Sequence, residues 1–459
     1  MKAILGEIMR EFYEFGIPDD VKSRDVDYLE KRNAATVITG MRRTGKTYVT
    51  YQRMRALVDS GVPLERIVHI NFDDDRLKGL RLEHLRLVGD IHAEMFPDAA
   101  REMCWYFLDE LQDIEGWELY ARRLLDSHLV QLCLTGSSSK MLSGEIATQM
   151  RGRSIDVEVF PLSFAEFLRF NSLVKSMPSA PYSSRTAGLL RHSMQRYLDE
   201  GGFPDVQGDD YRMRVKVLQG HVDAVLYRDV IERHQVPSVQ SLRYTLEYIK
   251  HNFAHKISTR AISGVLKGLG LSDSREYVSD YLDWLEQAYL IHRVPIRTDS
   301  LAVRRMNPNK FYLVDTGLAR AVTPKSDASS GCFLENLVFL ALRRGYNKIE
   351  YVNTQQGEEV DFLVTDRSTK RRRLIQVAWE MSSPETEERE LSALKAARSE
   401  LKVDDCTVVT WDEERELDGI KIVPVWKWSL EENGSSKKLV EKHIEAKPQN
   451  TPKPAFAGH

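Results

Sequence analysis

The sequence predicts an α/β protein whose first part is a doubly wound parallel sheet. Short, β-branched and apolar segments recur along the first third of the chain, and helical patterns separate them. A glycine-rich turn joins the first of these segments to a helix. Each segment ends in small or polar residues, which is typical of parallel strands with a ligand site at their carboxyl ends. The predicted strands are residues 35–39, 66–72, 105–109 and 130–135.

The size and composition of the chain limit the class of protein. At 459 residues the chain is long enough for two to four domains, and its net charge of -3 favours neither a nucleic-acid partner nor its absence. Charged residues interrupt residues 1–16, so we expect no signal peptide, and no apolar run reaches membrane-spanning length. The four cysteines are scattered, which is typical of reduced core thiols. We expect a cytoplasmic protein without a membrane segment.

Residues 40–47, Gly-Met-Arg-Arg-Thr-Gly-Lys-Thr, match the phosphate-binding pattern G-x-x-x-x-G-K-[ST] between a predicted strand and a predicted helix. The backbone N–H groups and the helix dipole favour a phosphate group there. We expect Lys46 to reach the β- and γ-phosphates and Thr47 to ligate magnesium. Arg42 and Arg43 are either phosphate contacts or surface charges. The predicted nucleotide-binding residues are Gly40, Arg42, Arg43, Thr44, Gly45, Lys46, Thr47 and Tyr48.

Asp109 and Glu110 follow four apolar or aromatic residues at the end of a predicted strand. Such a pair is often structural, but downstream of a phosphate loop in the same sheet it predicts the second nucleotide motif. We expect Asp109 to hold magnesium through water and Glu110 to act as the base that polarises the attacking water. Gln112 either contacts this site or starts a helix.

Two further positions are candidates for catalysis. Ser137 follows the strand 130–135 and either senses the γ-phosphate or caps the next helix, within the run Gly136-Ser137-Ser138-Ser139. Arg153 either stabilises charge on the transferred phosphoryl group, from the same or a neighbouring subunit, or forms a surface ion pair. The neighbouring-subunit alternative implies a homo-oligomer.

The second half of the chain contains different patterns. Two helical stretches, 257–266 and 275–290, are joined by a glycine-rich turn and followed by extended residues 291–295 and 310–315. This order is that of a winged helix. The helix 275–290 carries Asp280, Asp283 and Glu286 against Arg275, so protein docking is at least as well supported as DNA binding. From residue 333 the order is helix, three strands, helix, strand.

Together these motifs resemble the prokaryotic AAA-type ATPases that carry an uncharacterised C-terminal domain. The resemblance implies ATP and Mg²⁺ as cofactors, and it implies a core at 1–165, a helical lid at 166–236, a winged-helix-like segment at 237–318 and a degenerate PD-(D/E)xK nuclease-like domain at 319–430. We expect a disordered tail at 431–459. The motifs are the phosphate loop, Asn71 to Asp74, Leu108 to Gln112 with Trp117, Thr135 to Ser138, Gly152-Arg153 before Pro161 to Phe164, Gly201 to Pro204, Tyr312 to Leu318 and Glu335 to Val338.

The nuclease-like part resembles a core in which a helix Glu, a strand Asp and a Glu-x-Lys bind magnesium and activate water. Glu335 and Asp361 fit, whereas Gln376 replaces the second acid and Ala378 replaces the lysine. We therefore expect weakened metal binding and lost cleavage, unless Glu380 or a nearby lysine takes over the role.

The sequence thus predicts an ATPase that hydrolyses ATP with magnesium and drives or switches its C-terminal modules. Lys46, Ser137, Glu110 and Arg153 are the predicted catalytic residues, and Thr47 and Asp109 the predicted metal ligands. One alternative is an ATP-gated nuclease or DNA-binding protein, with Glu335, Asp361 and Gln376 as a degenerate second site. Another is a nucleotide-switched module that binds a protein partner with little turnover.

Overall fold

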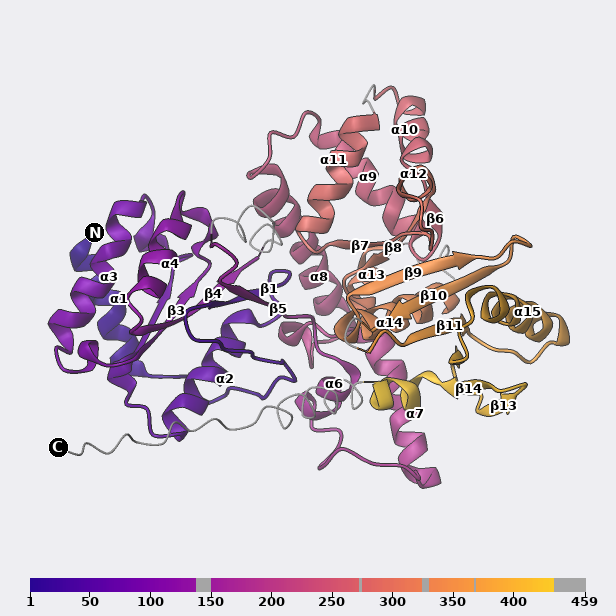
Figure 1. Ribbon diagram of the computed structural model, residues 1–459, viewed down its shortest axis with the longest axis horizontal. Coiled ribbons are helices and arrows are strands. Elements are labelled where there is room, and N and C mark those ends of the chain that lie inside the picture. Colours follow the sequence, from indigo (N-terminus) through magenta and orange to yellow (C-terminus); the bar gives the residue numbers. More distant parts are fainter. Residues whose placement is uncertain (138–149, 272–274, 324–329, 367–368, 433–459) are drawn as a thin grey trace, which may run out of the picture.

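The computed structural model describes residues 1–137, 150–271, 275–323, 330–366 and 369–432. Its first part is a five-stranded, entirely parallel sheet in the order β2-β3-β4-β1-β5 (Figure 1). The predicted α/β class and the four predicted strands are confirmed. The elements are α1 (Lys2–Phe15), β1 (Ala35–Thr39), α2 (Lys46–Asp59), β2 (Ile67–Asn71), α3 (Leu82–Met95), β3 (Cys104–Asp109), α4 (Trp117–Asp126), β4 (Val130–Gly136) and β5 (Ser154–Glu158).

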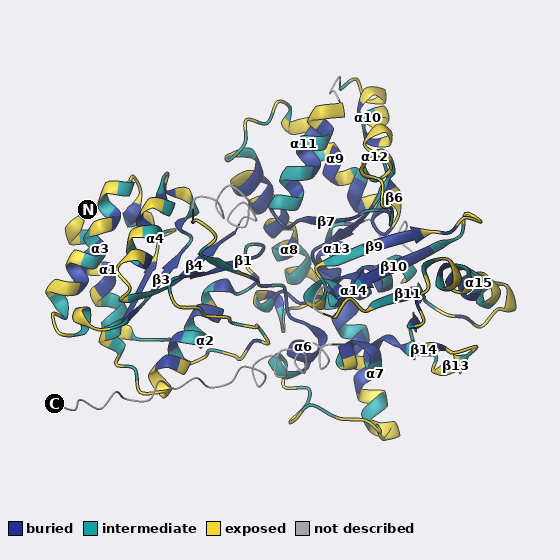
Figure 2. Ribbon diagram, in the orientation of Figure 1, coloured by how far each residue is buried: buried dark blue, intermediate teal, exposed yellow. Residues whose placement is uncertain are grey.

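Both faces of this sheet are covered, which explains why its strands are apolar without alternation. Val37 packs on the side of α1, α3 and α4, while its neighbour Ile38 packs with residues of α2 on the other side. All five residues of β1 are buried (Figure 2). The carboxyl edge of the sheet is therefore left as the place where polar side chains can meet.

Helices follow the first sheet and lead to a small three-stranded sheet in the order β6-β8-β7. β8 pairs antiparallel with both β6 and β7, and α12 lies between β7 and β8. The helices are α6 (Phe164–Phe170), α7 (Ser184–Glu200), α8 (Tyr211–Val225), a π-helical turn (Leu226–Ile231), α9 (Val239–Asn252), α10 (Thr259–Gly268), α11 (Arg275–Gln287), α12 (Leu301–Met306) and α13 (Thr316–Val322). The strands are β6 (Lys256–Ile257), β7 (Ile291–Val294) and β8 (Asn309–Leu313).

The last part is a separate six-stranded mixed sheet in the order β13-β14-β12-β11-β10-β9. β9, β10 and β11 are antiparallel neighbours, whereas β11, β12 and β14 run parallel. The elements are α14 (Ser330–Gly345), β9 (Lys348–Asn353), β10 (Glu359–Thr365), β11 (Arg372–Ala378), α15 (Pro384–Leu401), β12 (Cys406–Thr410), β13 (Arg415–Leu417) and β14 (Ile420–Pro424). The predicted tail lies outside the described residues from residue 433 onward.

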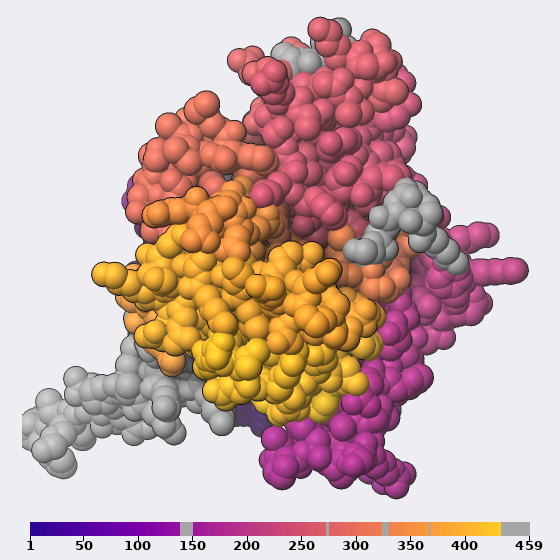
Figure 3. Space-filling view, turned by 90° about the vertical axis from the view of Figure 1, so that its right-hand side faces the viewer, coloured from indigo at the N-terminus to yellow at the C-terminus, as the bar shows by residue number. Residues whose placement is uncertain are grey.

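The helical part (α6 to α9), the three-stranded sheet and part of the last sheet share one hydrophobic core, which also includes Met41 of the loop after β1. Two of the motifs noted in the sequence meet in this core. Asp315 accepts a hydrogen bond from the Gly202 N–H at 2.6 Å, and a Cβ on Gly317 would lie 2.2 Å from the Glu200 carbonyl oxygen. Glycine is therefore required at position 317 by close backbone packing. Figure 3 shows the three-stranded-sheet part and the last sheet in contact on one face of the molecule.

In the part of the chain that the structure describes, no helix is long and apolar enough to span a membrane.

A buried ion pair joins the irregular segment before β1 to the start of α6. Arg24 donates to Glu166 Oε1 at 2.8 Å, to the Thr44 carbonyl in the phosphate loop at 2.7 Å and to the Phe160 carbonyl at 2.8 Å. Both side chains are almost fully buried. Burial opposes ionisation of Glu166, but the Arg24 charge outweighs it and lowers the pKa to about 2.

Glu166→Gln is expected to lower the free energy of unfolding by about 3–5 kcal/mol, because it leaves the Arg24 charge buried without its partner. The stabilisation is present above the unfolded-state pKa of about 4.3 and is lost as pH falls toward the folded-state value of about 2. Chemical denaturation at pH 7 and pH 3 measures both effects. The control is Asp418→Asn, which breaks the exposed pair with Lys395 and should cost less than about 1 kcal/mol. Equal losses in the two variants would contradict the prediction.

Candidate active site

The loop of residues 40–45 connects β1 directly to the first residue of α2, Lys46. Gly40 has a φ of 146°, and a Cβ there would lie 2.2 Å from the carbonyl oxygen of Val159, just after β5. The loop can therefore pass this close to the neighbouring strand only with glycine at position 40. The first N–H groups of a fourteen-residue helix consequently face the carboxyl edge of the sheet.

Thr47 and Asp109 meet at this edge although 62 residues separate them in the sequence. The Thr47 hydroxyl donates to Asp109 Oδ2 at 2.6 Å. Thr135, on the strand between β3 and β1, donates its hydroxyl to the other carboxylate oxygen of Asp109. Burial, together with the nearby Glu110 charge, raises the pKa of Asp109 to about 6. The site therefore presents one hydroxyl and one carboxylate side by side, an oxygen donor set that suits a hard cation.

Glu110 lies next to the loop lysine. Its Oε1 is 3.5 Å from Lys46 Nζ, and its Oε2 accepts a hydrogen bond from Gln112 at 2.6 Å. Burial opposes ionisation, but the charge of Lys46 and the Gln112 hydrogen bond outweigh it, so the pKa of Glu110 is below its ordinary value. The Glu110 side chain is thus ionised at neutral pH, as a proton acceptor must be. The Glu110 N–H donates to Thr135 Oγ1 at 3.1 Å, which fixes its left-handed backbone.

The structure reveals a buried acid, Asp229, that the sequence did not single out. It lies on the π-helical turn after α8, and its side chain is fully buried. Asp229 accepts hydrogen bonds from Arg42 at 2.8 Å and from Ser137 at 3.0 Å, and it pairs with Arg233 at 3.2 Å. Arg42, Ser137 and the helical part are thus joined through one carboxylate. The spacing of Asp229 and Arg233 was visible in the sequence, but partners 92 and 187 residues away were not.

Arg153 does not reach the phosphate loop of its own chain. It comes immediately before β5, and its carbonyl accepts from the N–H of Ala35, the first residue of the parallel strand β1. The phosphate loop follows the other end of β1, about 17 Å away for a strand of this length. The Arg153 guanidinium pairs with Asp126 at 2.7 Å instead. The expectation that Arg153 acts within the same subunit is therefore wrong, because Arg153 lies at the amino end of the sheet.

The remaining predicted loop residues differ in exposure. Thr44 is buried and donates its hydroxyl to the Met41 carbonyl at 3.0 Å, whereas Arg43 and Tyr48 are exposed beside the loop. The neighbours of Ser137 in the serine run, Ser138 and Ser139, lie outside the described residues. Of the two loop arginines, Arg42 is thus a half-buried contact to the helical part and Arg43 a surface residue.

Glu335, Asp361 and Gln376 also come together, at a second place far along the chain. The Asp361 N–H donates to Gln376 Oε1 at 3.1 Å, and Gln376 donates to Glu390 Oε2 at 2.6 Å. Lys310 of β8, which the sequence did not associate with this site, bonds both Glu335 and Asp361. Burial raises the pKa of Glu335 to about 7, and three surrounding carboxylates raise the pKa of Lys310 in spite of its burial.

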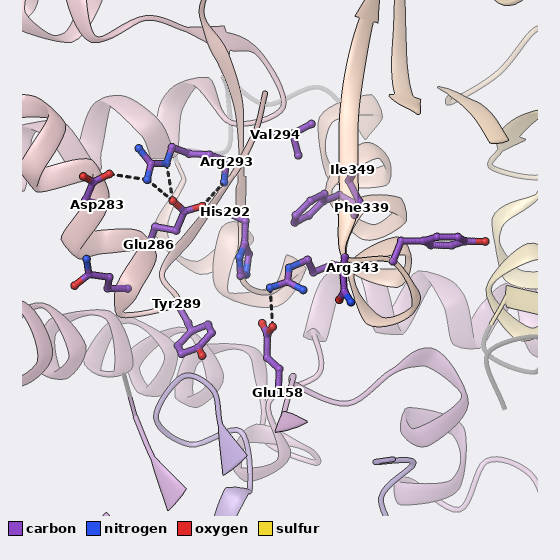
Figure 4. Close-up of a pocket in the computed structure, with 13 residues that line it drawn as sticks. Glu158, Asp283, Glu286, Tyr289, His292, Arg293, Val294, Phe339, Arg343 and Ile349 are labelled. Carbon is purple, nitrogen blue, oxygen red and sulfur yellow. Dashed lines mark hydrogen bonds and ion pairs between the residues drawn. The ribbon is translucent and has the colours of Figure 1, made fainter. Parts of the chain in front are cut away.

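A cavity of about 480 Å³ lies where β5, β7 with α11, and α14 meet (Figure 4). Arg343 of α14 pairs with Glu158 of β5 at 2.7 Å on its wall. Tyr289, also on the wall, donates its hydroxyl to Thr39 Oγ1 at 2.8 Å, and Thr39 directly precedes Gly40. The end of β1 that enters the phosphate loop is therefore in contact with the later parts of the chain.

Parts of the chain match known protein families. Residues 32–168 match the family described as an AAA domain, and residues 191–329 and 330–428 match two domains of unknown function, DUF8612 and DUF4143. Among solved structures, a Walker-type ATPase of Pyrococcus abyssi aligns with 70% of this chain and 95% of its own length, at 15% identity and a TM-score of 0.39.

Two curated relatives extend over almost the whole chain. An uncharacterised protein of Haemophilus influenzae is 28% identical over 413 residues, which cover 90% of this chain and 96% of that protein. The uncharacterised protein MJ1544 of Methanocaldococcus jannaschii is 32% identical over 446 residues, which cover 94% of this chain and 96% of that protein. The chain therefore belongs to the family of the M. jannaschii protein, and its first part is a P-loop ATPase domain of the AAA type.

Proposed function

We propose that this protein binds ATP with Mg²⁺ and hydrolyses it at the carboxyl edge of the five-stranded sheet. One observation carries the proposal: Lys46 and Thr47 at the start of α2 meet Asp109 and Glu110 at the end of β3. The Thr47–Asp109 distance of 2.6 Å and the Lys46–Glu110 distance of 3.5 Å place a cation donor set, an ammonium group and an ionised carboxylate together. Phosphoryl transfer depends on this combination of positioning and charge.

Each side chain has a separate role in this proposal. The Thr47 hydroxyl and the Asp109 carboxylate would hold Mg²⁺, which when bound neutralises negative charge on the phosphates. The backbone of residues 40–47 and the Lys46 ammonium would bind the phosphate oxygens. Lys46 now donates to the carbonyls of Gly40 and Met41, both at 3.2 Å, so its ammonium is already held over the loop. Glu110 orients the attacking water and accepts its proton.

Asp229 supports the further proposal that nucleotide state moves the later parts of the chain. Its carboxylate holds Arg42 inside the loop and Arg233 in the helical part, and both arginines contribute to the low pKa of Glu110. A triphosphate at the loop competes with Asp229 for these guanidinium groups, because the triphosphate and the Asp229 carboxylate are both anions that pair with arginine. Binding and hydrolysis therefore change the contact between the loop and the helical part.

For the later parts we propose a winged-helix segment and a nuclease-like fold that act on a protein partner more readily than on DNA. The order α9, β6, α10, α11, β7, β8 with the sheet order β6-β8-β7 supports the winged helix. Two acids of α11, Asp283 and Glu286, pair with Arg293 of β7, yet the helix still presents no basic face for phosphate.

Any arginine that assists hydrolysis from outside, including Arg153, belongs to a neighbouring copy. In that case the rate per subunit rises with protein concentration.

The test is to titrate ATP into the purified protein by calorimetry and to measure phosphate release, each with Mg²⁺ and with EDTA. The expected result is binding heat together with phosphate release that requires Mg²⁺. If folded protein gives no binding heat and no phosphate release, the proposal is overturned. Binding heat without phosphate release, both for the protein alone and with an added protein partner or DNA, would indicate a nucleotide switch instead of an ATPase.

A further inference from the structure

At the second acidic site, several oxygen atoms already accept hydrogen bonds from the protein. Asp361 Oδ2 already accepts from the Val377 N–H at 2.9 Å, and the Gln376 carboxamide oxygen is engaged by the Asp361 N–H. Glu335 Oε1 accepts a hydrogen bond from Tyr312 at 2.7 Å. Hydrogen bonds from the protein thus occupy part of this donor set, and Gln376 supplies no charge to a cation.

An ammonium group lies at the centre of this site. Lys310 Nζ is 2.7 Å from Asp361 Oδ1, 2.9 Å from Glu335 Oε1 and 2.6 Å from Glu359 Oε1. A lysine has three N–H donors, and here each has its own carboxylate acceptor. The Lys310 side chain is 3% exposed. We call Lys310, Glu335, Glu359 and Asp361 the Lys310 cluster.

We propose that the Lys310 ammonium takes the place of a divalent cation, so that the cluster joins two parts of the chain and does not serve as a metal site. The carboxylates come from α14 and β10 of the last part, whereas Lys310 comes from β8 of the three-stranded sheet. Buried carboxylates need a counter-charge, and a second cation within about 3 Å of an ammonium would be strongly repelled. The nuclease-like part is therefore closed to magnesium and does not cleave nucleic acid.

Other contacts connect the same two parts. Lys256 of β6 pairs with Glu359 Oε2 at 2.6 Å. The Tyr351 N–H of β9 donates to the Pro295 carbonyl at 3.0 Å, and the Arg297 N–H donates to the Tyr351 carbonyl at 2.7 Å. The three-stranded sheet and the last sheet are thus held together at their backbones and at the cluster. Any nucleotide-driven movement carries them as one unit.

The experiment measures Mn²⁺ binding by electron paramagnetic resonance in the absence of nucleotide, a readout independent of the ATPase proposal. The unmodified protein and Asp361→Asn should bind equal amounts of Mn²⁺. Lys310→Met should gain one Mn²⁺ per chain, and Lys310→Met with Asp361→Asn should lose it again. A loss of Mn²⁺ when Asp361→Asn is introduced into the unmodified protein would overturn the proposal, and so would no gain in folded Lys310→Met.

Thermal unfolding keeps the proposal testable if Lys310→Met folds poorly, because that variant leaves Glu335 and Asp361 without their cation. Its melting temperature should fall in EDTA and recover with Mn²⁺. The triple variant Lys310→Met, Glu335→Gln, Asp361→Asn leaves only Glu359, which retains Lys256, and should not respond to Mn²⁺. The proposal is overturned if Lys310→Met is unfolded both in EDTA and with Mn²⁺ while the triple variant folds. It is also overturned if the unmodified protein cleaves DNA with Mg²⁺ and Asp361→Asn abolishes this cleavage.

Discussion

Glu110→Gln is expected to lower the turnover number for ATP hydrolysis by about 10²–10⁴-fold, the range over which a positioned general base contributes. The amide has nearly the same shape but cannot accept the proton of the attacking water. ATP affinity should stay within a few-fold of the unmodified value, because removing a carboxylate 3.5 Å from Lys46 does not remove the ammonium that binds phosphate. Phosphate release and binding of a fluorescent ATP analogue measure the two quantities separately.

The matched control is Glu115→Gln, the same chemical change at an exposed position five residues further along. It should leave both turnover and affinity unchanged. If Glu110→Gln hydrolyses ATP at the unmodified rate, Glu110 is not the base. If it loses ATP binding as well, its main role is to organise the loop lysine.

Lys46→Ala is expected to weaken ATP binding by about 100-fold, which takes binding below detection at ordinary concentrations. Losing a charge-assisted contact to phosphate costs about 3 kcal/mol, and each 1.4 kcal/mol is a factor of ten. Calorimetric titration of ATP with Mg²⁺ measures the effect. Circular dichroism must show an unchanged fold, because Lys46 is buried and bonds two loop carbonyls.

Lys78→Ala serves as the control, since Lys78 is an exposed lysine in the same part of the chain. Its loss should change ATP binding by less than about twofold under the same salt conditions. Unaltered ATP binding by folded Lys46→Ala would place the phosphate site elsewhere and would remove the basis for the roles of Thr47 and Asp109.

Much of the first part of the fold could be predicted because its information is local. A buried strand, a glycine turn and a helix follow one another within 25 residues, and the loop pattern allows few other conformations. The meeting of Thr47 and Asp109 follows from a general rule, since the carboxyl ends of parallel strands share one edge. In the later parts α10, α11, α14, α15 and the strands β9 to β12 were predicted, whereas α9 and β14 were missed. The two-residue β6 and the short helix α12 carry too little pattern to be detected.

The error at Arg153 shows where such local information ends. The chain order places Arg153 after Ser137 and so suggests the same neighbourhood. However, β5 begins at Ser154 and runs parallel to β1, so a residue just before β5 must lie at the opposite edge. Arg24 and Asp229 were missed for a related reason. Arg24 is in an irregular segment and Asp229 in a helical one, and at neither position does the sequence pattern predict the distant partners.

The sequence by itself determined the phosphate loop, the acidic pair at the end of β3 and the α/β class, because these depend on short-range spacing and on the periodicity of apolar residues. Only the tertiary structure decided what the charged groups of the later parts contact. Lys310 and Asp361 are 51 residues apart, and Arg42 and Asp229 are 187 apart. A buried charge requires a partner, but any of several acids could have satisfied each cation. Which acid lies there depends on how the sheets and helices pack.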